Sequence, residues 1–98
     1  MIKGDGLAVL DEALQDKEED LRVEVVVALR LAGKDGVPVL VKALKDKSVD
    51  VRLNAVDALG RLGPDAKDAE APLTEAKKDP EQSVRAAAEE ALGLIKKK

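Results

Sequence analysis

Apolar residues recur along this chain at the spacing of amphipathic helices, in three pairs of segments. The shorter stripes comprise Leu7, Leu10, Ala13 and Leu14, then Val37, Leu40, Ala43 and Leu44, then Leu73 and Ala76. The longer stripes comprise Leu21, Val25, Ala28, Leu29 and Ala32, then Val51, Ala55, Ala58, Leu59 and Leu62, then Val84, Ala88, Ala91, Leu92 and Ile95. Because residues three, four and seven apart share one helix face, the pattern predicts an all-α chain of about six helices.

Fixed landmarks mark the three pairs as copies of one unit. The longer stripe of each pair contains an arginine, and an aspartate lies six residues before it in the preceding turn. These residues are Asp16, Asp46 and Asp79, with Arg22, Arg52 and Arg85. The copies lie 30 and then 33 residues apart, a period typical of stacked helical units in a solenoid. We expect a single domain over residues 1–98, built from units at about 5–34, 35–67 and 68–98.

Turn-forming residues predict where the helices begin and end. Ser48 is a candidate N-cap for the second helix of unit two, and Pro38 fits the first turn of the first helix, where a missing N–H costs nothing. Gly33 and Gly63 follow the first two second helices, as C-terminal glycines commonly do. The connection over residues 63–68 is three residues longer than its predecessor, and we expect an extra turn there.

The first helix of unit three has a thin apolar face. Lys77 stands where the other units have leucine, and Glu70 stands where unit two has Val37. Fewer apolar side chains bury less surface, so we expect this helix to fray more easily than its counterparts.

The sequence Val-Arg-x-x-Ala-x-x-Ala-Leu-Gly occurs at residues 51–60 and again at 84–93. With the aspartate-containing turns before it, this motif resembles the HEAT repeat, specifically the phycobilisome-lyase-type HEAT-like subclass. The resemblance covers nearly the whole chain and implies a right-handed α-solenoid of three HEAT-like helical hairpins. It also implies that the six aspartates and arginines form a polar ladder between neighbouring units. Unit one departs from the motif, with Val25 replacing the small alanine and Arg30 replacing the glycine.

Composition narrows the classes of function. The chain has no His, Cys, Phe, Trp or Tyr, and its net charge is −3. The commonest catalytic bases, nucleophiles and transition-metal ligands are therefore missing, as are aromatic platforms for bases or flat cofactors. A negative charge disfavours nucleic acid, and no apolar run is long enough for a membrane helix. We expect a cytoplasmic protein that is not an enzyme, holds no cofactor and binds neither nucleic acid nor membrane.

The aspartate–arginine pairs could be read as catalytic units, since a carboxylate beside a guanidinium is common in active sites. Their recurrence in every unit argues for a structural role instead, because a catalytic site normally occurs once.

The second helices carry the strongest candidate for binding. The positions one, four, five and eight residues after each arginine are predicted to lie opposite the buried stripe. They are apolar in unit one, half apolar in unit two and acidic in unit three. Adjacent exposed apolar side chains indicate an interface. The candidate protein-binding residues are Val23, Val26, Val27, Leu53, Val56 and Asp57.

Three occupants compete for this surface: another protein, a second copy of the chain in a homodimer, or the N-terminal segment including Ile2. We expect a protein–protein interaction scaffold or adaptor that binds through the second helices. The alternative is a self-assembling or purely structural repeat module, natural, engineered or excised from a longer array. An accessory domain of an enzyme is a third reading.

Overall fold

The computed structural model describes residues 5–96, with side chains from residue 7 onward, and every element within that range is helical. The α-helices are α1 (Asp5–Ala13), α2 (Glu19–Leu29), α3 (Val37–Ala43), α4 (Val49–Leu62), α5 (Glu70–Ala76) and α6 (Gln82–Lys96). Two 3₁₀ segments, η1 (Arg30–Gly36) and η2 (Gly63–Ala69), connect one pair of helices to the next. The predicted all-α fold with six helices is confirmed.

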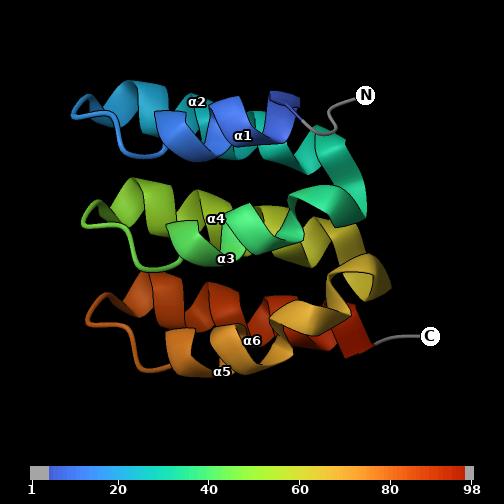
Figure 1. Cartoon of the computed structure of the whole chain (residues 1–98). Coiled ribbons are helices and arrows are strands. Elements are labelled where there is room, and N and C mark those ends of the chain that lie inside the picture. Colours follow the sequence, from blue (N-terminus) through green and yellow to red (C-terminus); the bar gives the residue numbers. More distant parts are fainter. Residues whose placement is uncertain (1–4, 97–98) are drawn as a thin grey trace.

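The six helices form three hairpins stacked as layers of an α-solenoid (Figure 1). The first helices α1, α3 and α5 line one side of the stack, and the second helices α2, α4 and α6 line the other. The short turns within the hairpins are aligned along one edge, whereas η1 and η2 lie at the opposite edge. Helix α4 packs against α3 of its own unit and against both α2 and α6, so the middle second helix is covered on three sides.

The core fills the space between the two rows of helices and between the layers. Its largest fully buried side chains include Leu29, Leu40, Leu59 and Leu73, which come from four different helices. Small residues bring the second helices close together. A Cβ atom added at Gly60 would lie only 3.1 Å from the Cβ of Ala91. Small residues therefore allow the second helices of units two and three to approach closely.

Unit one packs differently at the position of Gly60, where it has Arg30. Helix α2 ends at Leu29, and the chain continues as the 3₁₀ segment η1. Accordingly α4 packs more extensively against α6 than against α2. The departure of unit one from the motif thus coincides with a shorter second α-helix and with less contact between that helix and α4.

The predicted Ser48 cap and the Gly63 end of α4 are present, whereas Gly33 lies inside η1, because α2 already ends at Leu29. The Ser48 hydroxyl accepts a hydrogen bond from the Val51 N–H at 3.3 Å and caps α4. Gly33 and Gly63 have φ values of 61° and 60°. Residues other than glycine rarely adopt this backbone conformation. The expected extra turn is η2. The 3₁₀ segment η1 after α2 was not predicted.

The outer faces of the first and last units differ. Leu21 was predicted to lie in the buried stripe, but 40% of it is exposed, whereas its counterparts Val51 and Val84 are fully buried. Those valines point toward the preceding unit. No unit precedes unit one among the described residues. Val9 is likewise 62% exposed, while its counterpart Val39 is buried.

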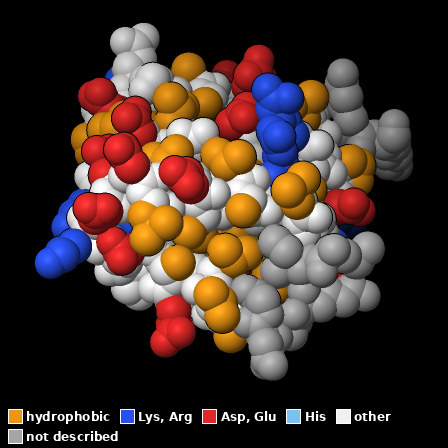
Figure 2. Space-filling model, turned by 90° about the horizontal axis from the view of Figure 1, so that it is seen from above, with side chains coloured by type: hydrophobic (Ala, Val, Ile, Leu, Met, Phe, Trp, Pro, Cys, Tyr) orange, Lys and Arg blue, Asp and Glu red, His pale blue; other side chains and the backbone are white. Residues whose placement is uncertain are grey.

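We call this outer surface of unit one the N-terminal face and define it by Val9, Glu12, Asp16 and Leu21. Figure 2 views the molecule from this end and shows apolar side chains spread over the surface, with acidic side chains along parts of its edge. The opposite outer face, on unit three, is more polar. There Lys77 and Glu89 replace the residues that units one and two bury at the same positions, namely Leu14, Leu44, Val26 and Val56.

Candidate functional site

The repeated arginines and aspartates link successive units through buried or half-buried hydrogen bonds. The Nε atom of Arg22 donates to Oδ2 of Asp46 at 3.1 Å. The Nε and Nη2 atoms of Arg52 donate to the two carboxylate oxygens of Asp79 at 2.8 and 3.2 Å. In each case the arginine belongs to one unit and the aspartate to the next, so each pair forms one rung between layers.

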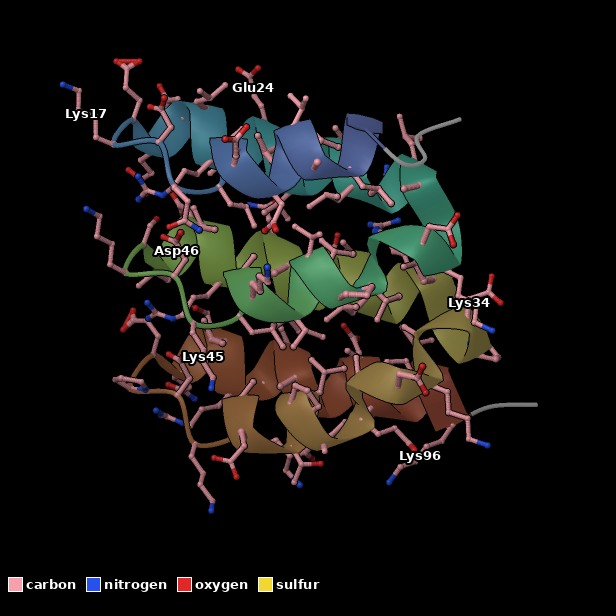
Figure 3. All side chains as sticks on the ribbon, in the orientation of Figure 1. Lys17, Glu24, Lys34, Lys45, Asp46 and Lys96 are labelled. Carbon is pink, nitrogen blue, oxygen red and sulfur yellow. The ribbon has the colours of Figure 1, made fainter. Side chains whose placement is uncertain are left out.

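Each of these residues also holds the turn of its own unit. Nη1 of Arg22, Arg52 and Arg85 donates at 2.8 Å to the backbone carbonyl of the aspartate six residues earlier. The carboxylates of Asp16, Asp46 and Asp79 accept the backbone N–H two residues later at 2.8 to 2.9 Å. Because the same groups close the turn and join the layers, the arrangement fits a structural ladder better than a catalytic site. Figure 3 labels Asp46 at the turn edge of the stack.

The ladder has an open position at each end. Among residues 5–96, no arginine or lysine forms an ion pair with Asp16, and no carboxylate forms one with Arg85. Arg85 is exposed, whereas Arg22 is buried. The terminal units therefore each carry half of a rung.

Two of the predicted binding residues, Val26 and Val56, are buried in the core with no exposed surface. The prediction that they belong to an exposed ridge is wrong. Four helical residues advance about 400°, so each valine lies only about 40° around the helix from the arginine that reaches the next unit. They consequently face the neighbouring layer. The hydrophobic pattern of one helix does not show which of its residues the neighbouring layers cover. A second helix packs on the second helices of adjacent units as well as on its own first helix.

The exposed surface lies about 100–200° around the helix from the arginine. We call it the second-helix ridge, and it comprises Val23, Glu24, Val27, Leu31, Leu53, Asn54, Asp57, Arg61, Ala86, Glu90 and Leu94. Val23, Val27, Leu53 and Asp57 of the predicted set therefore lie on it.

The most apolar part of the ridge is in unit one. Val27 is 48% exposed and Leu31 is 74% exposed, and both line a shallow hollow of about 410 Å³ together with Val23, Glu24, Ala28 and Arg30. The sequence analysis missed Leu31. It lies nine residues after Arg22, about 180° around the helix, and the period of 3.6 residues would have placed it on the outer face.

The ridge becomes more polar in units two and three. A smaller hollow of about 290 Å³ is lined by Leu53, Asn54, Asp57 and Ala87. Asp57 accepts from Arg61 at 2.9 Å in an exposed ion pair within α4. Such a pair is screened by water and contributes little to stability. Leu94 adds a half-exposed apolar side chain in α6.

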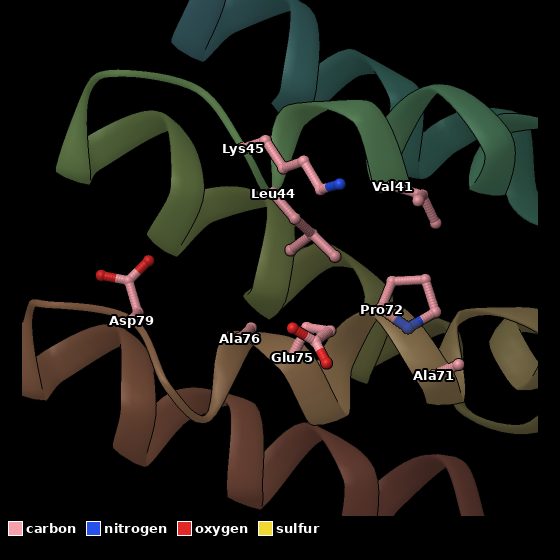
Figure 4. Close-up of a pocket in the computed structure, with 8 residues that line it drawn as sticks. All are labelled: Val41, Leu44, Lys45, Ala71, Pro72, Glu75, Ala76 and Asp79. Carbon is pink, nitrogen blue, oxygen red and sulfur yellow. The ribbon is translucent and has the colours of Figure 1, made fainter.

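A second concavity, which the sequence analysis did not identify, lies between α3 and α5. Figure 4 shows this groove, with Val41, Leu44 and Lys45 on one side and Pro72, Glu75 and Asp79 on the other. Its volume is about 510 Å³. The thin apolar face of α5 accounts for the groove, because the small Ala71 and Ala76 do not fill the space below α3.

Within the described range, the charged groups form no cluster that could hold a metal ion. Across residues 5–96, no three acidic side chains gather as metal ligands would. No helix in this range has the length and apolar character needed to cross a membrane. Ile2, proposed above as part of a cover for the ridge, lies outside the described residues.

Comparisons with known proteins bear on the family rather than on the partner. A family model for HEAT repeats matches residues 7–93, which is nearly all of the chain. No curated protein matches the sequence. The match agrees with the stacked hairpins and with the motif at residues 51–60 and 84–93, while the finer resemblance to the phycobilisome-lyase-type subclass stays a prediction.

Proposed function

The chain belongs to the HEAT-repeat family, and from this premise we propose that it is a non-catalytic module that binds another protein on its second-helix ridge. HEAT repeats commonly mediate protein–protein interactions. As part of the same proposal the module works in the cytoplasm. Stable disulfides are rare in that compartment, so a chain without cysteine is compatible with it.

The observation that carries the proposal is the apolar hollow in unit one. Val27 and Leu31 are large aliphatic side chains left exposed side by side, and they share a hollow with Val23. Burying such side chains against a partner removes apolar surface from water, at roughly 25 cal/mol per Å². A hollow of this kind fits one apolar anchor side chain of a partner segment.

The distribution of charge along the ridge indicates the direction in which a partner segment would lie. In unit one the ridge holds Val23, Val27 and Leu31 with one carboxylate, Glu24, whereas unit three presents Glu90 on the ridge with Glu89 beside it. A partner segment with an apolar anchor at one end and basic residues at the other would match both parts, because complementary charge fixes the register of an interface. The ladder joins the three second helices into one stack, so binding should involve little backbone change.

The test uses peptides selected for binding to the chain from a random peptide library. Val27→Glu combined with Leu53→Glu places two charges on the ridge, and Val9→Glu places one on the exposed N-terminal face as the matched control. We expect selected peptides to carry an apolar anchor near basic residues. Their dissociation constants, measured by isothermal titration calorimetry, should rise more than about tenfold for the double variant, a loss of about 1.4 kcal/mol, and stay unchanged for Val9→Glu.

Circular dichroism must show that both variants keep the helicity and melting temperature of the parent chain, so that lost binding reflects the ridge. Peptides that bind the double variant as tightly as the parent chain would refute this assignment. NMR shift changes centred on the α3–α5 groove would move the binding function to that groove.

A further inference from the structure

The two outer faces of the stack each carry one half of a contact that the molecule makes between its own layers. We propose that copies of this chain associate end to end, with unit three of one copy stacked on the N-terminal face of the next. This inference does not depend on the second-helix ridge, because the ridge lies on the side of the stack and the two faces lie at its ends.

The first observation is the open rung at each end. Arg85 donates from Nη1 to the carbonyls of Asp79 and Pro80, but its Nε, the atom with which Arg22 and Arg52 reach the next unit, donates to no group of residues 5–96. Asp16 accepts the N–H of Glu18, as Asp46 and Asp79 accept theirs, but receives no arginine from residues 5–96. Arg85 of one copy and Asp16 of another would complete a rung with the geometry that occurs twice within the chain.

The second observation is a glycine without a local explanation. Gly60 of α4 is required because Ala91 of the next unit approaches it closely. Gly93 holds the same position in α6, yet a Cβ added there would meet no heavy atom within 4 Å in the described structure. A glycine inside an exposed helix costs about 1 kcal/mol relative to alanine. End-to-end stacking would place Ala28, the counterpart of Ala91, against Gly93 and give this glycine the same function as Gly60.

The third observation is the chemical complementarity of the two faces. The N-terminal face offers exposed Val9 and Leu21 with Glu12 and Asp16 around them. The outer face of unit three offers the exposed cations Lys77, Lys78 and Arg85. Within the chain, Lys45 and Glu75 line the α3–α5 groove from opposite sides (Figure 4). Lys78 and Glu12 are their counterparts and would face each other across the new contact.

One pair opposes the contact and makes it weak. Val56 lines a small hollow together with Ala87 and Ala91 of the next unit. The counterpart of Val56 in unit three is Glu89, and the counterpart of Ala87 in unit one is Glu24. Stacking would therefore bring Glu89 near Glu24, and like charges facing each other across an interface oppose association. The association should accordingly be reversible and visible at high protein concentration.

Such a contact joins two different faces, so it does not close on a dimer. A head-to-tail contact continues from copy to copy and yields open chains whose mean length increases with concentration. A face-to-face dimer through the N-terminal face is disfavoured, because both copies would contribute the carboxylates Glu12 and Asp16, and none of the four residues that define this face is a cation.

The test is the weight-average mass of the full chain by light scattering over a dilution series. Refractive index must report the concentration, because the chain has no Trp or Tyr. The mass should rise above 10.4 kDa as the concentration increases. Glu89→Val restores the valine of units one and two and should tighten association by about tenfold or more. The matched control Glu90→Val adds the same side chain one residue away, on the ridge, and should leave association unchanged.

Charge exchange tests the rung itself. In the Glu89→Val background, Asp16→Arg and Arg85→Asp should each weaken association, and the combined variant should restore it. Circular dichroism establishes that each variant is folded. The proposal is overturned if the Glu89→Val chain stays monomeric at every concentration, if its mass stops at twice 10.4 kDa, if Glu90→Val associates equally well, or if the charge exchange fails to restore association.

Discussion

Arg52 and Asp79 lie in different repeats, and one guanidinium–carboxylate contact holds those repeats in register. Arg52 donates to both oxygens of Asp79, at 2.8 and 3.2 Å, and its remaining nitrogen, Nη1, donates to the carbonyl of Asp46 at 2.8 Å. Little of either side chain is exposed. The turn of one repeat and the turn of the next are therefore fixed by the same side chain, which explains why aspartate and arginine recur at constant spacing.

Removing one carboxylate of the ladder should cost more than removing its unpaired counterpart. Asp46→Ala leaves the buried Arg22 without its ion pair and removes the hydrogen bond to the N–H of Ser48. Breaking a buried pair on one side typically costs about 3 kcal/mol. Asp16→Ala removes the corresponding turn hydrogen bond but no ion pair within residues 5–96, and should cost only about 1 kcal/mol.

Urea unfolding of the two variants measures this difference directly. Equal losses of stability for Asp46→Ala and Asp16→Ala would show that the rung contributes nothing beyond the turn. Because Asp16 belongs to the proposed end-to-end contact, both unfolding curves must be taken at a concentration where the chain is monomeric.

Two adjacent valines should differ greatly in their response to the same substitution. Val26 is fully buried between layers, whereas Val27 is 48% exposed. Val26→Glu places a carboxylate in the core without a partner, at a cost of about 4 kcal/mol or more, which a domain of this size cannot easily tolerate. Val27→Glu should leave the free energy of unfolding within about 0.5 kcal/mol of the parent. Thermal unfolding followed by circular dichroism distinguishes them, and similar melting temperatures would contradict the assigned burial.

Two glycines should differ in sign when replaced by alanine. Gly63 has a φ of 60°, so Gly63→Ala should destabilise the chain by about 1–2 kcal/mol although there is room for the methyl group. Gly93 lies inside α6 with open space around it, so Gly93→Ala should stabilise the monomer by about 1 kcal/mol. Denaturant unfolding of the monomer measures both. A loss of stability in Gly93→Ala would show that α6 needs this glycine for itself.

Gly93→Ala also tests the end-to-end contact independently of charge. A methyl group at this position would approach Ala28 of the neighbouring copy as closely as one at Gly60 would approach Ala91. Association measured by light scattering should therefore fall while monomer stability rises.

Helix α5 should open before its counterpart α3. Helix α5 buries only Leu73 and Ala76, whereas the equally long α3 buries Val37, Val39, Leu40 and Ala43. Elements with few buried contacts open with lower free energy. Hydrogen exchange followed by NMR should show faster exchange in α5 than in α3. Leu73→Ala, which removes the largest apolar side chain of this helix, should cost about 3 kcal/mol. Equal protection of α3 and α5 would contradict this prediction.

Much of the fold follows from local pattern, and the errors have a common cause. The six helices, the Ser48 cap and the Gly63 end of α4 were predicted correctly, because each depends on neighbours within a few residues along the chain. Leu21, Val26 and Val56 were placed wrongly because their exposure depends on other layers. Leu21 matches the buried pattern but has no preceding layer to cover it among residues 5–96, and Val26 and Val56 lie on the side that meets the next layer.

The sequence by itself determined that this protein is a stack of helical hairpins, because helical periodicity, turn residues and the recurring aspartate and arginine are local and repeated. Only the tertiary structure decided which parts of each helix remain exposed. A second helix packs on its own first helix and on two neighbouring layers, so its outer face is narrower than one amphipathic stripe indicates. That Val27 and Leu31 stay exposed while the neighbouring Val26 is buried is decided only once the layers are stacked.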